Sequence, residues 1–473
     1  MRQTINPQMQ LGEVDISAIT FNPKSRDDIP RLLRGLQHIW VTPDLREQVF
    51  QVLESMIPAS SNNGRPGMDL WNILVFGTLR LVTNCDYDRL QELANEHGTL
   101  RKMLGHGPYC THSYHIQTLQ DNISLFTPEI LDQVNQIVVA AGHQLVKKKD
   151  EPLYGRADSF VVKTDVHFPT DISLLNDACR KAIEFASTLA GQYQLPAWRQ
   201  REYLKKQHRK RYHKVRNLKH SVAACEFKQR SRQHDIETAH LEYIKYSLDI
   251  IRKAESTAAL VEKSAPDESA LENLKYYIAH SRHQINLIYR RVIEHQQIPH
   301  SDKVFSIFEP HTEWISKGKA GVPVELGLRV CVLQDQFGFT LNHHVMQKQT
   351  DDQVAVPIAK GAKQRFPMLS QVSYDKGFWS PANLEELDGF LERTILPKKG
   401  RLSAEDKKRE HHLEFTRAKR KHSAVESDIN ALEANGLDKC PDKGIDAFKR
   451  YVALAVVGGN LKRLGRILQE RDF

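Results

Sequence analysis

Apolar residues in the first 150 positions recur at the spacing of α-helices. Between Met68 and Leu104 they follow one another every three or four residues, which places them on one face of a helix. The turn signal His97-Gly98 divides part of this stretch into two short helices. A helix-turn-helix DNA reader and a plain helical packing module fit this pattern equally well. The spacing therefore predicts an all-α N-terminal domain over residues 1–150.

The helical spacing ends at Tyr154, and the segment SFVVKTDVHF, rich in β-branched and aromatic residues, is predicted as a strand. Further extended segments are predicted at 303–310, 323–335 and 338–346, and the last two form a hairpin through Gln336-Phe337. The remaining predicted elements are a helix at 351–365, a strand at 371–378, a helix at 382–392, a short strand at 393–397 and helices from Ser403 onward.

The segment 172–302 interrupts this strand pattern and is helical almost throughout. Apolar residues alternate at three- and four-residue intervals from Leu241 to Ile251 and again from Leu271 to Val292. Pro266, in KSAPDES, marks a turn between the two series. This arrangement predicts two long helices folded back on each other as an antiparallel hairpin.

Without the insertion, the order of elements is strand, strand hairpin, helix, strand, helix, strand and helices. That order is typical of an α/β fold with a mixed sheet flanked by helices, as in ribonuclease H-like domains. We therefore expect a ribonuclease H-like core over 151–171 and 303–440, the helical insertion over 172–302, and a C-terminal helix over 441–473.

Net charge and cysteine usage indicate the kind of partner and the redox environment to expect. Lys and Arg total 67 against 58 Asp and Glu, a net charge of +9, which suggests a polyanionic partner once the cations cluster. The six cysteines form no CxxC pair, as expected in a reducing cytoplasm. One local group of His and Cys residues could either bind zinc or belong to a solvated loop. Its spacing matches no common zinc finger, which favours the loop. That group is His106, Cys110, His112 and His115.

Membrane and secretory segments are not expected. The first fifteen residues lack the apolar core of a signal peptide. The longest apolar run, Tyr451 to Val457, is too short to cross a bilayer. We therefore predict a cytoplasmic protein without a membrane partner.

Two aspartates lie where a sheet could present metal ligands. Asp158, in GRADSFVV, is predicted at the start of the first strand, with Asp165 and Asp171 as nearby rivals in a loop. Asp375, in SYDKGFWSPANLEEL, follows a short strand and precedes a turn at Gly377 and a helix capped near Ser380 or Asn383. A carboxylate at the carboxyl end of a strand is well placed to bind a ligand. Each position taken alone also fits an ordinary turn or cap.

Glu426 is the third candidate carboxylate, on a helix that begins with a cationic run. A carboxylate one turn beyond such a run could bind a metal while the cations hold phosphates, although a solvated helix face explains the same pattern. Basic runs also occupy 198–216, with nine Lys or Arg against one Glu, and 398–409. Such runs bind DNA phosphates without sequence choice.

The loop SKGKAG resembles a phosphate-contacting loop but lacks the features of a P-loop, so we expect no nucleotide cofactor. Dense cationic runs are often solvated faces. Beside candidate metal ligands they favour DNA contact instead. The predicted DNA-binding residues are Arg199, Lys205, Lys206, Arg209, Lys210, Arg211, Lys317, Lys319, Arg417, Lys419, Arg420, Lys421 and His422.

Five blocks of the chain together resemble one known family. They are SFVVKTDVHFPTDISLL, VFSIFEPHTEWISKGKAG, VELGLRVCVLQDQFGF, SYDKGFWSPANLEEL and VALAVVGGNLKRLG. In this order they are similar to the DDE transposases of bacterial insertion sequences, in the unclassified group with an N-terminal helical domain. The resemblance covers roughly Met68 to Arg466. Its motif positions match Asp158-Ser159, Asp375-Lys376-Gly377-Phe378, Val425-Glu426 and Gly436-Leu437.

The resemblance departs from the pattern around Glu426. Related families place Tyr, Arg and Lys seven and four residues before and seven after this Glu, where this chain has Lys419, His422 and Glu433. His422 would have to replace the Arg. It could contact phosphate when protonated or serve only as a hydrogen-bond donor.

The resemblance implies metal-dependent DNA cleavage and strand transfer at insertion-sequence ends. Asp158, Asp375 and Glu426 would be the catalytic and metal-binding residues, holding two Mg²⁺ (or Mn²⁺) ions. The partners would be double-stranded DNA, as terminal inverted repeats and target, with a homodimer acting on bacterial nucleoid DNA and the N-terminal domain binding the ends. Two alternatives remain: a structure-selective nuclease with the same core, and a domesticated DNA-binding protein without catalysis.

Overall fold

The computed structural model describes residue 4 and residues 13–57, 67–220, 226–264, 269–316 and 323–471. The chain forms two compact units. The first contains residues 1–165 and 313–473, and the second contains residues 166–312. The first unit thus includes the sheet, the predicted N-terminal helices and the predicted C-terminal helix. The predicted insertion, 172–302, lies inside the second unit.

Seven helices precede the sheet in the first unit. Asp27 caps the first of them by accepting a hydrogen bond from the Ile29 backbone N–H at 2.7 Å. The turn predicted at His97-Gly98 is present, but the helix after it has only six residues, and its Leu100 and Met103 are buried. This favours a packing role for the pair. The seven helices are α1 (Asp28–Val41), α2 (Pro43–Glu54), α3 (Leu70–Val82), α4 (Tyr87–Glu96), α5 (Gly98–Met103), α6 (Ile116–Ile123) and α7 (Pro128–Val146).

A mixed seven-stranded sheet forms the centre of the first unit, in the order β2-β3-β1-β5-β6, with β4 also paired to β3 and β7 to β1. The pairs β1–β3, β2–β3 and β3–β4 are antiparallel, whereas β1–β5, β5–β6 and β1–β7 are parallel. The strands are β1 (Leu153–Thr164), β2 (Glu313–Ser316), β3 (Val324–Gln334), β4 (Thr340–Met346), β5 (Leu369–Tyr374), β6 (Arg393–Ile395) and β7 (Lys439–Cys440).

Helices cover both faces of this sheet. The Tyr374 hydroxyl donates to the Ala355 carbonyl at 2.9 Å, so α12 lies on the face that carries Ala157 and Tyr374. The opposite face carries Arg156 and Ser373, which contact α16 and α15 respectively. The helices after β4 are α12 (Asp351–Arg365), α13 (Pro381–Asp388), α14 (Ala404–Glu410), α15 (Leu413–His422), α16 (Ala424–Leu432) and α17 (Ile445–Arg471), with a π-helical turn at Glu433–Leu437.

The secondary structure differs from the sequence prediction at several places, and the strand predicted at 371–378 ends at Tyr374. Residues 303–310 form no strand but an irregular segment after a short 3₁₀ helix, His300–Asp302, and Ile307 packs against helix α8 of the same unit. β2 and β7 were not predicted, because strands of four and two residues carry almost no periodic signal. The helix predicted through Glu426 is broken at Ser423 into α15 and α16.

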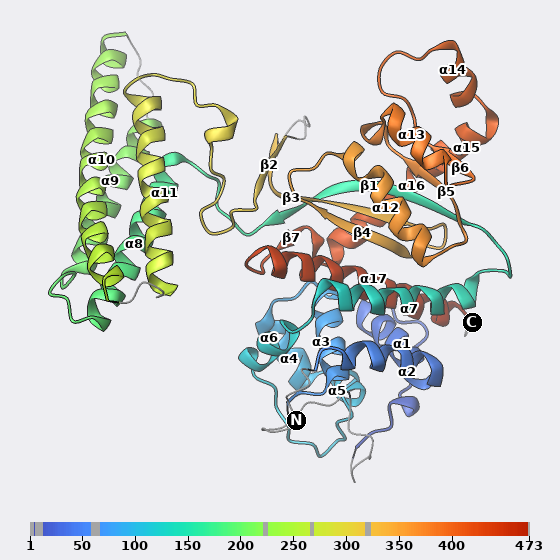
Figure 1. Cartoon of the computed structure of the whole chain (residues 1–473). Helices are drawn as coiled ribbons and strands as arrows, with labels where there is room; N and C mark the ends of the chain where they lie inside the picture. The colour runs from blue at the N-terminus through green and yellow to red at the C-terminus, as the bar shows by residue number, and fades with distance from the viewer. Residues whose placement is uncertain are drawn as a thin grey trace. The chain divides into compact units, whose positions relative to one another are not determined.

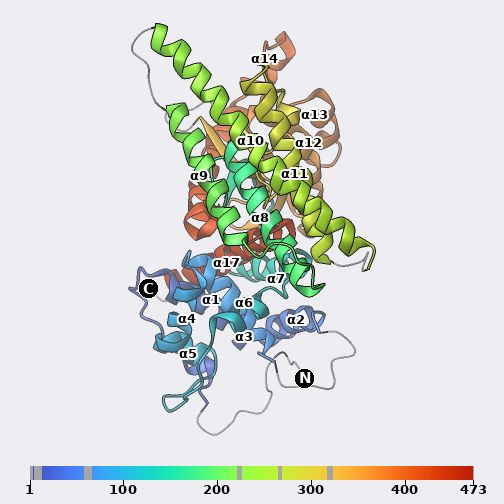
Figure 2. The same ribbon diagram turned by 90° about the vertical axis from the view of Figure 1, so that its left-hand side faces the viewer.

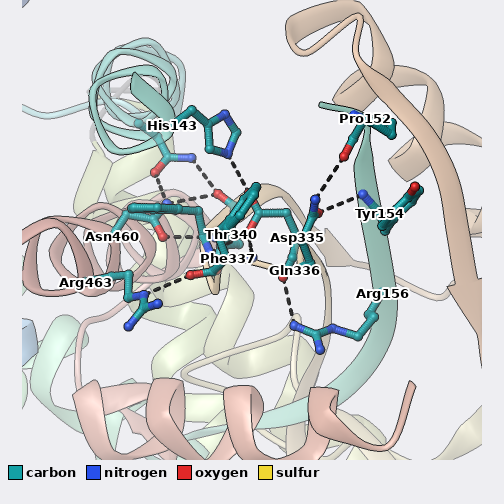
Figure 3. A network of polar contacts seen from close by, with 12 residues as sticks. His143, Pro152, Tyr154, Arg156, Asp335, Gln336, Phe337, Thr340, Asn460 and Arg463 are labelled. Carbon is teal, nitrogen blue, oxygen red and sulfur yellow. Dashed lines mark hydrogen bonds and ion pairs between the residues drawn. The ribbon is translucent and has the colours of Figure 1, made fainter. Parts of the chain in front are cut away.

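α7 and α17 run side by side between the sheet and the helices α1 to α6 (Figure 1). α17 contains the apolar run Tyr451 to Val457, and every residue of that run is buried. Its Asn460 side chain accepts from the Thr340 backbone N–H at 2.9 Å and donates to the Asn135 amide oxygen at 2.7 Å. Asn135, on α7, in turn donates to the Thr340 carbonyl at 3.0 Å. This buried network, drawn in Figure 3, joins two helices to the start of β4.

Four helices make up most of the second unit and lie alongside one another (Figure 2). The predicted hairpin corresponds to α10 and α11, and its turn around Pro266 lies outside the described residues. Trp198 is buried here and donates from its indole Nε1 to the Thr257 hydroxyl at 2.9 Å. The helices are α8 (Asp171–Gln192), α9 (Arg201–His220), α10 (Glu226–Glu262) and α11 (Ser269–Val292).

Replacing Asn460 by Ala should lower the free energy of unfolding by about 2–3 kcal/mol, because it leaves the Thr340 N–H and the Asn135 amide oxygen buried without these partners. Urea denaturation followed by circular dichroism measures the loss. Asn430→Ala is the matched control, since Asn430 is exposed on α16 and should change stability by less than about 0.5 kcal/mol. Equal effects of the two variants would contradict the role given to the network.

Candidate active site

Asp158 lies on β1, and Asp375 directly follows β5, the parallel strand beside it. Ala157 on β1 pairs with Tyr374, the last residue of β5, so each aspartate is the next residue along the chain. Because paired strands lie about 4.8 Å apart, this register brings the two backbone positions close together. Asp158 lies in the middle of β1 rather than at its start, which corrects the sequence prediction. The strand begins at Leu153, and small buried residues (Gly155 and Ala157) concealed its first half.

The segment after Asp375 has the predicted form. A single 3₁₀ turn, Lys376–Phe378, leads to α13, whose N-cap Ser380 accepts from the Asn383 backbone N–H at 3.1 Å. A Cβ atom added at Gly377 would lie 3.2 Å from the Asp351 carboxylate Oδ2. A glycine therefore lets the backbone after Asp375 pass close to a second acidic side chain.

Glu426 lies in the first turn of α16, which packs against β1. Two polar contacts fix this region of the chain to the sheet. Arg156 Nη2 donates to Asp428 Oδ2 at 3.2 Å, two residues beyond Glu426. The Ser373 hydroxyl lies 3.1 Å from His422 Nδ1, at the end of α15. Since Arg156 and Ser373 each stand two residues before a candidate aspartate, the same strand segments position all three carboxylates.

Electrostatics place the three candidates in one region. The pKa of Asp158 is raised to about 6, chiefly by burial and in addition by the neighbouring charges of Asp375, Asp351 and Glu426. A hydrogen bond from the Ser159 backbone N–H at 2.7 Å acts in the opposite direction. Asp375 and Glu426 are exposed. Within the described part of the chain, no ion pair neutralises any of the three. Asp375, Asp351 and Glu426 thus lie within electrostatic reach of Asp158.

Asp351 is a fourth carboxylate of this region, and the sequence reasoning missed it. It is the first residue of α12, where Oδ1 accepts from the Ser159 hydroxyl at 2.6 Å and Oδ2 lies 3.8 Å from Arg329 Nη1. The available signal was its position in QTDDQ, where it directly follows a predicted strand and opens a predicted helix. Asp351 holds Ser159, and through it the strand segment that carries Asp158.

His422 lies within hydrogen-bonding distance of Ser373, in surroundings that disfavour its protonated form. Burial lowers its pKa below the usual histidine value, and Arg156 lowers it as well, against opposing contributions from Asp375 and Glu426. Of the two roles left open by the sequence, the contact with Ser373 supports the hydrogen-bonding one.

The rival aspartates are engaged elsewhere. Asp165 pairs with Lys439 at 2.6 Å and with Lys443 at 3.5 Å, which lowers its pKa. Asp171 opens α8 and pairs with Arg291 at 2.9 Å. Both therefore have structural partners, whereas Asp158 keeps its carboxylate among other carboxylates.

The His and Cys group of the N-terminal region is a hydrogen-bonded loop. Nε2 of His106 lies 2.8 Å from the Tyr114 hydroxyl and Nδ1 lies 3.3 Å from Cys110 Sγ, so both ring nitrogens have partners. Arg101 donates to the carbonyls of Cys110 and His112 and fixes the loop backbone. Burial lowers the pKa of His106 to about 4.

Some of the predicted DNA-binding cations have partners within the protein, and others are exposed to solvent. Lys205 pairs with Glu184 and Glu202, and the Arg211 guanidinium lies 4.1 Å from the centre of the Tyr246 ring, so both are engaged within the second unit. Lys317 and Lys319 lie outside the described residues. The remaining cations are exposed to solvent: Arg199, Lys206, Arg209, Lys210, Arg417, Lys419, Arg420 and Lys421.

In the described ranges, no group of three or more His, Cys, Asp or Glu side chains is arranged to hold a metal ion as it stands. No helix among the same residues has the length and apolar character needed to cross a membrane. Comparison with protein-family models, curated proteins and solved structures finds no match for this chain. The chemistry of the site therefore has to be inferred from its own residues.

The raised pKa of Asp158 predicts a pH-dependent loss of stability. Because the folded pKa of about 6 exceeds the ordinary value of 3.8, ionising Asp158 costs more in the folded chain, and stability falls as pH rises from about 4 through about 6. Asp158→Asn removes this cost and should be more stable than the wild type by about 1–2 kcal/mol at pH 7.5, with little difference at pH 4.

Unfolding measured across pH 4–8 for both proteins gives the difference directly, since all other titrating groups cancel. Asp388→Asn, at an exposed position on α13, is the control and should follow the wild type at every pH. Parallel curves for Asp158→Asn and the wild type would contradict the assigned environment of Asp158.

Proposed function

We propose that this chain is a transposase with a ribonuclease H-like core, which cleaves DNA at the ends of a mobile element and joins them to a target. The observation that carries the proposal is the β1–β5 register, which sets Asp158 beside Asp375, in a region that Glu426 shares. The mixed sheet, with antiparallel strands on one side of β1 and parallel strands on the other, supports the fold. The sequence resemblance supports transposition as the reaction.

Divalent cations fit the donor set of this site. Mg²⁺ and Mn²⁺ prefer carboxylate oxygens, and Asp158, Asp375 and Glu426 supply them without cationic partners in the described chain. Two such ions, when bound, would activate the attacking oxygen and stabilise the leaving oxygen at phosphorus. The carboxylates are not closed into a metal cage. Their repulsion, which contributes to the raised pKa of Asp158, is the force that bound cations would relieve.

The other residues of the site act by positioning. Asp351 holds Ser159 beside Asp158, and Arg156 holds α16, which carries Glu426. His422 contacts Ser373, and burial lowers the pKa of its imidazole. The exposed cations of α15 and α9 would contact the phosphates of double-stranded DNA, both terminal repeats and target. Two DNA ends require two active sites, so we propose that the chain acts as a homodimer on DNA.

Asp375→Asn should reduce cleavage and joining of labelled end DNA in Mg²⁺ to background, because it removes a charged metal ligand while keeping the side-chain volume. Affinity for the same DNA, measured without metal, should change less than about threefold. Asp388→Asn, an exposed acid on the following helix, should cleave and join normally. Normal cutting by Asp375→Asn would exclude the site. Cleavage without joined products would instead indicate a nuclease.

Lys206 and Lys210 stand one turn apart on α9, are exposed, and have no ion-pair partner among the described residues. Replacing both by Gln should weaken duplex DNA binding and reduce the slope of log Kobs against log[salt] by about 2, since each phosphate contact contributes roughly one released counterion. Fluorescence anisotropy from 50 to 300 mM salt measures the slope. The matched control is Lys245→Gln with Lys263→Gln, two exposed lysines of the same unit outside the basic run. Equal slope changes in both double variants would contradict a DNA-binding role of α9.

A further inference from the structure

A pocket of about 380 Å³ lies between the sheet and α15. The strand side is formed by Tyr154 and Arg156 of β1 and by Gln371 of β5. The helix side is formed by residues 414, 417, 418 and 421, whose spacing of three and four places them on one face of α15. Arg393, at the start of β6, closes the remaining side.

The charges around this pocket are unbalanced. Four cations line it (Arg156, Arg393, Arg417 and Lys421) against two acids (Glu392 and Glu414). Arg156 is itself paired with Asp428 at 3.2 Å. Glu414 is already paired with Arg393 at 2.7 Å. Arg417 and Lys421 have no ion-pair partner in the residues that the structure describes. The pocket therefore offers two free cations to an anion.

Arg156 adds a donor without a partner. Its Nη2 donates to the Asp335 carbonyl at 2.8 Å and to Asp428, but its Nε is buried and makes no hydrogen bond. A buried guanidinium N–H without a partner costs free energy unless a ligand accepts from it. An anion in the pocket that Arg156 lines would supply such an acceptor, and a guanidinium suits the oxygens of a phosphate.

The strand side of the pocket is rigid before any ligand binds. Gln336, which also lines it, accepts from the Tyr154 backbone N–H at 2.8 Å and donates to the Pro152 carbonyl at 2.9 Å (Figure 3). Arg156 is held from two sides in the same way. Because these groups are fixed in advance, binding pays little ordering entropy there.

The pocket adjoins the candidate active site. Ser373 lines the pocket and contacts His422, whose electrostatic neighbours include Asp375 and Glu426. Arg156 stands two residues before Asp158 on the same face of β1. An anion in the pocket would thus lie next to the reacting centre without occupying it.

We infer that this pocket binds a phosphate group of the DNA strand adjacent to the phosphate being cut. The assignment of this phosphate to DNA rests on the proposed function. The assignment of the pocket as a phosphate-binding site rests on the pocket residues alone. It separates Arg417 and Lys421, which line the pocket, from Lys419 and Arg420, which lie outside it on the same helix. It also adds Arg156 and Arg393, which the sequence did not single out.

The test uses the full chain without metal and three probes: dAMP, adenosine, and a ten-nucleotide single-stranded DNA. Titration calorimetry should detect dAMP but not adenosine, and the oligonucleotide should displace dAMP. Arg417→Gln with Lys421→Gln should weaken both phosphate probes about tenfold, through loss of two charge-assisted contacts. The matched control, Lys24→Gln with Arg26→Gln, removes two exposed cations of the same unit and should change either affinity less than about twofold.

Equal affinities for dAMP and adenosine, or equal losses in the two double variants, would overturn the phosphate site. Binding of dAMP that the oligonucleotide cannot displace would overturn the assignment to a DNA strand. Asp375→Asn separates this inference from the proposed function, because it should bind the probes like the wild type. If Asp375→Asn cleaves normally while the pocket variant loses dAMP, the proposed function fails and the pocket stands. If the pocket variant binds normally while Asp375→Asn is inactive, the reverse holds.

Discussion

The fully buried carboxylate of Asp335 holds the β3–β4 turn in place, and the candidate site depends on that turn. Asp335, in the β3–β4 turn, accepts from His143 Nε2 at 2.6 Å and from the backbone N–H groups of Phe337 and Phe339, each at 2.9 Å. A buried carboxylate is tolerated only when donors surround it, so the turn, α7 and the carboxylate must form together. The Asp335 carbonyl then receives Arg156, and Figure 3 shows how this joins the turn to β1. The positions of Asp158 and of α16 follow from that contact.

The site itself is organised by repulsion as much as by attraction. Asp375, Asp351 and Glu426 raise the electrostatic cost of ionising Asp158. Among the described groups, Arg329 lies near Asp351, and Ser159 donates hydrogen bonds to Asp158 and Asp351. Backbone pairing of β1 with β5 keeps these carboxylates near one another despite their repulsion, because this pairing does not depend on the side chains. Acidic side chains that lack cationic partners in the protein are suited to bind positive ions from solution.

The sequence predicts much of this arrangement where the signals are local. Asp375 follows a recognisable strand and precedes a capped helix, so its setting could be predicted from a dozen consecutive residues. The start of β1 could not, because Gly155 and Ala157 pack against neighbouring strands that lie far away in sequence. Asp351 was missed for the same reason, since its closeness to Asp158 arises from long-range contacts. β7 exists only through its pairing with β1.

The placement of the helical insertion has a consequence for the order in which the sheet can form. Every strand that pairs with β1 comes later in the chain, and the first of them, β3, begins at Val324, 160 residues after β1 ends at Thr164. At the usual speed of protein synthesis, about 5–20 residues per second, β1 waits on the order of ten to thirty seconds for a partner. During that time its apolar segment Phe160–Val162 has no paired edge on either side. An insertion that folds by itself would shorten the effective loop and limit this exposure, so its folding rate helps to set how much nascent chain reaches the native sheet rather than aggregating.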